Sequence, residues 1–372
     1  MSSDQSLPDR EPTLSEVRAA LPDDSRARSL AKGLFYFAIT AGPYLATFAA
    51  CALAPNWPLR VLFACVNGLT IAGLFVVGHD ACHGSLTPSQ AMNRLLGRLA
   101  LLPSLHPAAA WIHSHNGMHH GWTNLRGKDP VYAPFTKAEF DRLPRWRQWA
   151  ERIYRSEPGI ALFYLVEVWW HQEMFPKGVQ TPRGKAIHTF QRDRALVVAF
   201  GLTQLAVMGL APAPQIVHPA ITGLLSIAVG VMLPFMIWNW VMAYATFQHH
   251  THPQVPWYDR EEDWSAFRGQ VKSGVHVRLP RFFEVALHNI MDHTAHHVDP
   301  KIPLYNLPKQ QRVLEAAYPD DILVQAWDIA NFRRTLRICQ LYDYENYRWL
   351  RFDGTPTTER LVPERPAAQQ AA

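Results

Sequence analysis

The chain has 372 residues, a formal net charge of +5 and only four cysteines, Cys51, Cys65, Cys82 and Cys339. This length allows one large domain or two. The cysteines form no C-x-x-C pair, which argues against a disulfide framework or a cysteine-ligated zinc site. The mean hydropathy of −0.12 would suit a soluble protein, but it averages long apolar blocks with polar stretches. No nucleic-acid-binding motif accompanies the positive charge, so we expect no nucleic-acid partner.

The chain begins with a polar segment, residues 1–32, which we expect to be a flexible tail. It has no short apolar core behind a basic start, which argues against a signal peptide. Four apolar blocks follow, and each is long enough to cross the hydrocarbon core of a bilayer. They lie at about 34–54, 61–78, 195–210 and 219–247. We therefore predict four transmembrane helices in two hairpins.

The basic residues predict the orientation of these spans. All but Arg60 of the 36 Lys and Arg residues lie in the tail, in the loop between the second and third spans, or after the fourth span. By the positive-inside rule, these segments and both termini are cytoplasmic. We expect a multi-pass integral membrane protein, in the inner or plasma membrane if the source is bacterial.

Histidines gather in three short clusters on this predicted cytoplasmic side. Residues three or four apart on a helix lie on one face, so each cluster can direct several imidazoles to one point. A lone histidine is usually a surface or core residue, but repeated clusters at helical spacing indicate a metal site. The clusters are His79 and His83, then His115, His119 and His120, and finally His293, His296 and His297.

Eight imidazoles exceed what one metal ion uses, so the clusters predict two metals. Imidazole suits iron, zinc, copper and nickel alike. A structural zinc site would be closed by four ligands, whereas two redox-active irons that activate dioxygen fit the excess of ligands better. Asp80, Asp292 and Asp299 are candidates to orient the imidazoles, or are ordinary surface carboxylates.

The cluster patterns H-x3-H, H-x3-H-H and H-x2-H-H, in this order and after these spans, resemble the three histidine boxes of the membrane fatty acid desaturase family. The resemblance covers about residues 33–310. His288 before the last box and the segment from Ile302 to Leu307 after it resemble the acyl-lipid, methyl-end branch. So do residues 248–253, Q-H-H-T-H-P, with one residue inserted relative to Q-H-T-H-P. The second box is likewise one residue longer than the commoner H-x2-H-H.

This resemblance implies an all-α integral membrane fold with a cytosolic helical cap that holds a histidine-rich diiron site. It also implies about nine imidazole ligands, eight of them the catalytic box histidines. The ninth is expected to be His250, with His288 as the next candidate and His249 and His252 as weaker ones. The implied membrane desaturase domain is residues 33–310, and we expect a cytosolic C-terminal helical region at 311–361. Residues 362–372 are rich in Pro, Ala and Gln, which predicts a disordered tail.

The implied reaction is the O2-dependent introduction of a double bond into a membrane-associated acyl chain, carried by a lipid or by an acyl thioester. The chain contains no His-Pro-Gly-Gly haem motif and no flavin or nucleotide motif. Electrons must therefore come from an external carrier, a ferredoxin or a cytochrome, docking on the basic face beside the membrane lipids.

Three other functions remain open from the sequence. A diiron hydroxylase or ketolase would act on an acyl chain or a carotenoid, and His79-Asp80-Ala81 with the small polar turn after it also resembles carotenoid ketolases. The segment from Ile302 to Leu307 favours an acyl chain instead. A non-enzymatic metal transporter would hold ligands near the middle of its spans, yet these spans are nearly free of ionisable groups. A histidine-rich anchor or sensor would not need three regular boxes.

Overall fold

Four long helical segments dominate the structure, a computed structural model that describes residues 10–215 and 218–363. Each is long and apolar enough to cross a membrane. They are α2 (Leu30–Leu53), α3 (Trp57–His83), α10 (Lys185–Leu210) and the run Pro219–His250, which comprises α11 (Pro219–Ile227), the π-helix η5 (Ala228–Met232) and α12 (Leu233–His250). The predicted spans at 34–54, 61–78, 195–210 and 219–247 lie inside these segments apart from residue 54, and the segments are confirmed as long apolar helices. The first three helices begin four, four and ten residues earlier than predicted.

Polar caps determine where these helices begin and end. The side chain of Ser29 accepts a hydrogen bond from the Lys32 N–H at the start of α2, and Asn56 does the same for Leu59 at the start of α3. Such caps satisfy N–H groups that lack a partner in the first helical turn. Helix α3 ends at Gly84, whose φ of +68° is a left-handed conformation that glycine adopts readily. The first histidine cluster therefore occupies the last turns of α3.

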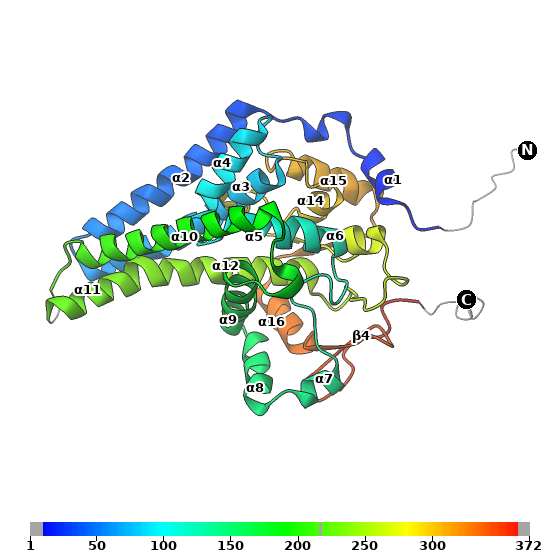
Figure 1. Cartoon of the computed structure of the whole chain (residues 1–372). Helices are drawn as coiled ribbons and strands as arrows, with labels where there is room; N and C mark the ends of the chain where they lie inside the picture. Colours follow the sequence, from blue (N-terminus) through cyan, green and yellow to red (C-terminus); the bar gives the residue numbers. More distant parts are fainter. Residues whose placement is uncertain (1–9, 216–217, 364–372) are drawn as a thin grey trace, which may run out of the picture.

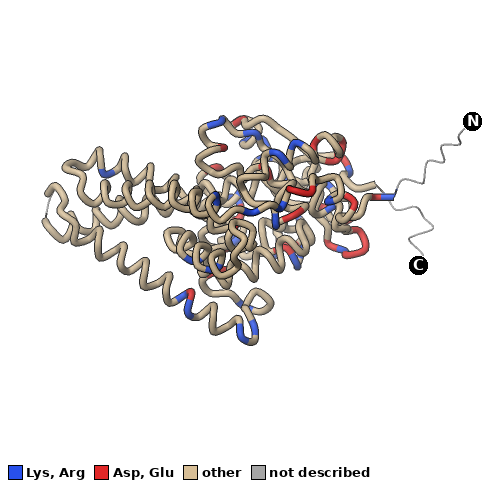
Figure 2. Tube along the Cα trace, turned by 90° about the horizontal axis from the view of Figure 1, so that it is seen from above, with Lys and Arg blue, Asp and Glu red and all other residues tan. Residues whose placement is uncertain are grey.

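The long helices project from a broader body built of short elements. In Figure 1, α2, α10, α11 and α12 extend together to one side, and α3 packs against α2 and α12. Figure 2 shows most of the Lys, Arg, Asp and Glu residues over the broader body, whereas the projecting helices are almost free of them. This separation of apolar helices from charged residues is typical of a protein associated with a membrane.

The broader body contains short helices and two small sheets. Between α3 and α10 lie α4 (Gln90–Leu101), α5 (Ala108–Trp111), η2 (Ile112–His119), α6 (His120–Trp122), α7 (Lys137–Arg142), α8 (Arg145–Tyr154), α9 (Gly159–Phe163), η3 (Tyr164–Met174) and η4 (Gly178–Gln180). After α12 come η6 (Arg268–Lys272), β1 (Val275–Arg278), α13 (Arg281–Ala286), α14 (His293–Val298), α15 (Leu307–Ala317), β2 (Leu323–Ala326), α16 (Ile329–Ile338), β3 (Leu341–Asp343) and β4 (Arg348–Leu350).

The strands qualify the expectation of a purely α-helical protein. Strand β1 pairs in parallel with β2, with Val275 opposite Leu323, and β3 pairs antiparallel with β4. Val275 and Val277 are both buried, and β-branched residues favour extended backbone. Helices still predominate. The region predicted as helical at 311–361 contains most of α15 and all of α16, together with β2, β3 and β4. Residues 364–372 of the predicted disordered tail lie outside the described residues.

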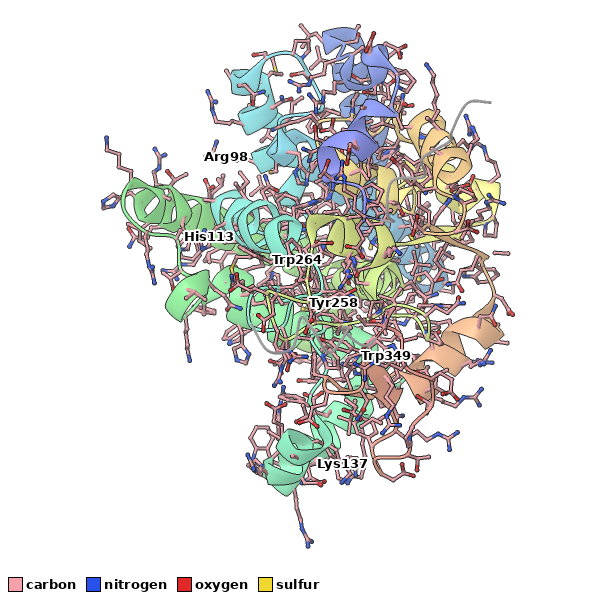
Figure 3. All side chains as sticks on the ribbon, turned by 90° about the vertical axis from the view of Figure 1, so that its right-hand side faces the viewer. Arg98, His113, Lys137, Tyr258, Trp264 and Trp349 are labelled. Atoms are coloured by element: carbon pink, nitrogen blue, oxygen red, sulfur yellow. The ribbon has the colours of Figure 1, made fainter. Side chains whose placement is uncertain are left out.

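An aromatic core joins the C-terminal hairpin to the segment that follows α12. Trp257, Tyr258 and Trp349 are almost completely buried there. In Figure 3, Tyr258, Trp264 and Trp349 lie among densely packed side chains, whereas Lys137 lies at the periphery of the molecule. This core holds the chain after α12 against the loop at residues 122–125, close to the second histidine cluster.

The described part of the N-terminal segment is a folded strap rather than a flexible tail. Residues 10–29 carry the short helix α1 (Leu14–Ala19), which begins with a capping box between Thr13 and Glu16, and the 3-10 turn η1 (Asp23–Arg26). Val17 is fully buried against residues of α14 and its neighbours. The Arg18 guanidinium donates to the Val298 carbonyl at 2.7 Å. The sequence did not predict this folded segment, because neither Arg18 nor Val298 stands in a recognisable motif and the two meet only in the folded chain.

Candidate metal centre

Nine imidazoles converge at the ends of α3 and α12 and on the short helices beside them. They form two groups, and within each group one possible ligand nitrogen per residue lies within 4.8 Å of the others. The first group is His79, His83, His115, His120 and His296, and the second is His119, His250, His293 and His297. The groups adjoin, since the His120 and His297 rings stack with centroids 4.3 Å apart. All eight box histidines are brought together, and the ninth is His250.

Distances between the nitrogens fit coordination of a metal by each group. Nε2 of His115 lies 3.1 Å from Nε2 of His79 and 3.1 Å from Nε2 of His120. In the second group, Nε2 of His250 and Nε2 of His293 are 2.8 Å apart. Imidazole nitrogens bind a metal at a metal–nitrogen distance of about 2.0–2.1 Å. When the nitrogen–metal–nitrogen angle is a right angle, two such nitrogens are about 3 Å apart. These donors therefore fit two metal ions that imidazole prefers, iron among them.

The imidazoles are held in the form that binds a metal. Burial, reinforced by the neighbouring histidines, lowers the pKa well below its ordinary value of 6.5 for His115, His120, His293, His296 and His297. A neutral imidazole has a lone pair to donate. Each group also contains a buried Nε2, on His83 and on His297, that has no hydrogen-bond partner among the described residues. A bound metal would satisfy both nitrogens.

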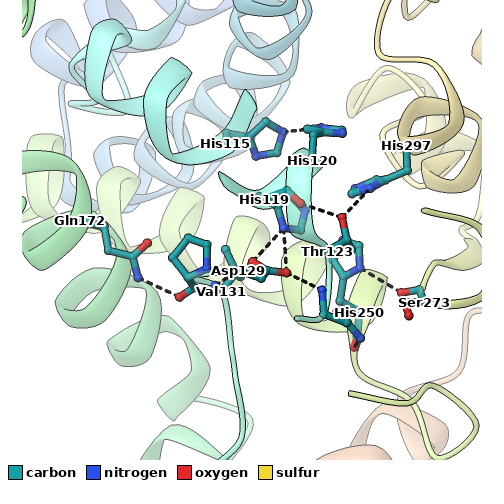
Figure 4. Close-up of polar contacts among 12 residues, drawn as sticks. His115, His119, His120, Thr123, Asp129, Val131, Gln172, His250, Ser273 and His297 are labelled. Atoms are coloured by element: carbon teal, nitrogen blue, oxygen red, sulfur yellow. Dashed lines mark hydrogen bonds and ion pairs between the residues drawn. The ribbon is translucent and has the colours of Figure 1, made fainter. Parts of the chain in front are cut away.

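The second histidine cluster lies on a π-helix, which changes which imidazoles face each other. In η2 the N–H groups bond to carbonyls five residues earlier, as the His120 N–H does to the His115 carbonyl. His115 and His120 therefore face the first group, while His119 turns into the second (Figure 4). The spacing had suggested one face for His115 and His119. Their ring centroids are 5.2 Å apart, but their nitrogens belong to different groups.

The third cluster is also divided between the groups. On α14, His293 and His297 join the second group and His296 joins the first. The spacing had suggested one shared face for all three. Because the two groups adjoin, a single short helix can supply both of them.

Comparison with known proteins agrees with this geometry. The family model described as fatty acid desaturase matches residues 55–327. This chain belongs to the fatty acid desaturase family. The assignment accounts for the apolar helices and the histidine groups, and it makes the protein an oxidoreductase.

Individual relatives are 28% identical to this desaturase over the parts that align. A chloroplastic omega-6 fatty acid desaturase of Glycine max is 28% identical over 78% of this chain, which spans 64% of that protein. An sn-1 oleoyl-lipid 12-desaturase of a Picosynechococcus strain is 28% identical over 80% of this chain and 81% of its own length. An sn-1 acyl-lipid omega-3 desaturase (ferredoxin) of a Synechocystis strain is 28% identical over 82% of this chain and 80% of its own length.

Acceptors around the second group fix the orientation of its rings (Figure 4). Nδ1 of His119 lies 3.1 Å from Asp129 Oδ1, and Nδ1 of His250 lies 3.0 Å from the Ser273 carbonyl. Nδ1 of His297 lies 2.7 Å from Gln270 Oε1. When Nδ1–H donates to these oxygens, Nε2 carries the lone pair that a metal needs. Sequence reasoning missed all three acceptors, since none stands in a histidine cluster.

Of the three aspartates considered from the sequence, one contacts a grouped histidine. Asp80 lies 3.4 Å from Nδ1 of His79 and also accepts the Leu304 N–H. Asp292 pairs with His276 at 3.2 Å, and Asp299 pairs with Arg26 of the strap. Asp80 therefore links the first histidine cluster to the segment from Ile302 to Leu307.

The other candidates for a ninth ligand lie outside both groups. Nε2 of His288 lies 2.9 Å from the Thr40 hydroxyl. His249 stacks on His293 with ring centroids 3.5 Å apart, and its Nε2 lies 3.2 Å from the sulfur of Met291. His252 accepts the Gln254 N–H, and burial lowers its pKa to about 4.

A small cavity of about 70 Å³ lies directly against the two histidine groups. Its histidine wall includes His79, His115, His119 and His293, and its apolar wall includes Phe75, Trp111, Val168, Met242 and Ile290. A larger cavity of about 590 Å³ is lined mostly by apolar side chains of α2, α3, α12 and α13, and Thr40 and His288 also line it. Apolar cavities beside a few polar groups suit a hydrocarbon ligand.

Proposed function

We propose that this desaturase introduces a double bond into a membrane-associated fatty acyl chain, using two irons and dioxygen. The observation that carries the proposal is the pair of adjoining imidazole groups against an apolar cavity. Family membership and the relatives named for acyl-lipid substrates support the same chemistry.

In this proposal each histidine group holds one iron. The first iron is held by His79, His83, His115, His120 and His296, and the second by His119, His250, His293 and His297. Bound iron supplies the activation of dioxygen that removal of hydrogen from an unactivated C–H bond requires. The ligands lie at the ends of the apolar helices rather than near their middle, which disfavours a transporter.

The protein's own contribution is to hold the acyl chain and to exclude water. Phe75, Trp111 and Met242 line the small cavity with apolar surface beside His79 and His115. A chain held there would present a methylene group to both histidine groups in a fixed orientation. The surrounding apolar side chains would keep solvent away from reactive oxygen.

The partners and the orientation follow from charge and from the relatives. A ferredoxin is the proposed electron donor, because one relative is named as a ferredoxin-dependent enzyme and the broader body carries the basic residues (Figure 2). The substrate is proposed to be lipid-linked, as the names of the relatives indicate for those proteins. We place four spans in two hairpins, with the histidine-bearing cap and both termini in the cytoplasm.

A lipid profile tests this function. The protein would be expressed in a bacterial host with a ferredoxin and its reductase, and total acyl chains would be analysed by gas chromatography–mass spectrometry with derivatisation to locate double bonds. We expect a new unsaturated chain that is absent from a His296→Ala variant. A hydroxylated product, or no product from iron-loaded protein, would contradict the proposal.

Two further variants test the ligand set. Iron per chain should fall in His250→Ala, whose Nε2 lies in the second group, and should stay at the wild-type level in His288→Ala. The latter is a matched control, because His288 is also a buried histidine but contacts Thr40 instead. The reverse result would exchange their roles.

A further inference from the structure

Glu173 is a buried carboxyl group that belongs to none of the three histidine clusters. It lies near the end of the π-helix η3, is 2% exposed and lines the small cavity. The Ser114 hydroxyl donates to Glu173 Oε1 at 2.6 Å, and Ser114 directly precedes the grouped His115. Glu173 Oε2 is also buried and has no hydrogen-bond partner in the described chain. A buried polar atom without a partner costs free energy, and a catalytic role is one explanation for keeping it.

The burial of Glu173 keeps its proton in place. Burial raises its pKa from the ordinary 4.5 to about 8, although the Ser114 hydroxyl opposes the shift. At neutral pH the group is therefore a carboxylic acid that holds a transferable proton. Other titratable groups line the same cavity from neighbouring elements: Tyr164, His79, His115, His119, His249 and His293.

The proposed reaction needs protons at this place. The overall change is R–CH2–CH2–R′ + O2 + 2 e⁻ + 2 H⁺ → R–CH=CH–R′ + 2 H2O, with both electrons from the external carrier. In the proposed function the box histidines are metal ligands, so they are not the proton donors. Burial raises the pKa of Tyr164 well above 10, so this hydroxyl retains its proton. Among the residues described around the cavity, Glu173 is the one carboxyl group.

We propose that Glu173 donates protons to the oxygen that leaves as water. In each transfer its carboxyl O–H bond breaks and an O–H bond forms on the reduced oxygen, and a proton from solvent then restores the acid. The Ser114 hydroxyl fixes the carboxyl orientation through Oε1, leaving Oε2 to carry the proton. This role rests on the proposed desaturase function.

The decisive variant is Glu173→Gln, which keeps the size and the bond from Ser114 but removes the acidic proton. Turnover should fall by about 10²-fold or more, in the range for loss of a general acid. Iron content should stay at the wild-type level, and consumed dioxygen should appear as hydrogen peroxide rather than as water. Glu151→Gln is the control, because Glu151 is a buried carboxylate paired with Arg147 outside this cavity.

A second measurement does not depend on turnover. The folded protein keeps the Glu173 proton up to about pH 8, whereas the unfolded chain releases it near pH 4.5. Between these values the wild type should lose stability relative to Glu173→Gln as pH rises. The difference in Tm between the two proteins, followed from pH 5 to 8, measures this effect.

Several results would overturn the inference. They are a Glu173→Gln turnover close to wild type, loss of iron from that variant, a raised KM with unchanged kcat, or a Tm difference that does not vary with pH. Absence of any product from the wild type would overturn the desaturase function, and with it the proton-donating role. The pH dependence of Tm would then still report whether Glu173 is protonated, so the two failures are distinguishable.

Discussion

Asp129 shows how single residues outside the histidine clusters prepare the site. It accepts from Nδ1 of His119 and also from the N–H of Asn124, and it is 2% exposed. The Asp129 carboxylate therefore fixes the orientation of the His119 ring and also stabilises the turn that follows α6. Such carboxylate–imidazole pairs also make the ring a better ligand.

Replacing Asp129 by Asn should weaken metal binding by about 10–100-fold. The neutral amide is a weaker acceptor for His119, and it can also present N–H where the imidazole needs an oxygen. Iron per chain after dialysis against a chelator measures the effect. Asp141→Asn is the matched control, because Asp141 is exposed and pairs with Lys137 on α7. Equal iron retention in both variants would contradict the role of Asp129.

At this scale the sequence predicted the ligands but not their neighbours. The box histidines could be found because they repeat at regular spacing, and His250 because it stands in a recognisable Q-H-H-T-H-P segment. Asp129, Gln270 and Glu173 carry no such pattern. The roles of Gln270 and Glu173 arise from contacts with residues far away in the chain, as Gln270 and His297 are 27 positions apart and Glu173 and Ser114 are 59 apart. Asp129 lies only 10 positions from His119, but no regular spacing marks it as a partner.

Among the elements, the π-helix η2 explains the long second box. A π-helix is an α-helix that has accommodated extra residues, and such segments are frequent at functional sites. The residue inserted between His115 and His120 is absorbed by the wider winding, so the two imidazoles still share a face. Local spacing could not reveal this, because an H-x3-H pair fits an ordinary α-helix equally well.

Deleting Gly117 should therefore be tolerated. His115 and the present His120 would then be four residues apart, and α winding would keep them on one face. Gly117 is exposed, and a Cβ atom placed on it would meet no neighbour within 4 Å. The deletion variant should retain iron and activity. Inserting an alanine after Gly117 should instead cause loss of iron. His115 and His120 would then be six residues apart, a spacing that keeps them on one face of neither an α-helix nor a π-helix. Iron loss from the deletion variant would contradict this account.

The apolar helices and the charged body divide the protein into two parts. The four spans could be predicted because a run of about 20 consecutive apolar residues is rare outside helices that cross a membrane. The small sheets and the strap could not, because strand pairing between β1 and β2 and burial of Val17 depend on contacts across the fold.

The proposed orientation predicts the behaviour of reporter fusions. Green fluorescent protein fused after the C-terminus should fluoresce, because that end is placed in the cytoplasm, and alkaline phosphatase fused there should be inactive. Alkaline phosphatase fused after Pro214, in the turn between α10 and α11, should be active because that turn lies at the opposite end of the spans. Activity of the C-terminal phosphatase fusion would invert the topology.

The strap has a consequence for the order in which the protein is made. Arg18 and its partner Val298 are 280 positions apart. At about 5–20 residues per second, the ribosome needs about 14–56 s to synthesise the chain between them. The N-terminal segment must wait that long before α14 exists to receive it. Closure of the strap over the last histidine helix is therefore a late event in biogenesis, and it cannot precede synthesis of the last three histidines of the two groups.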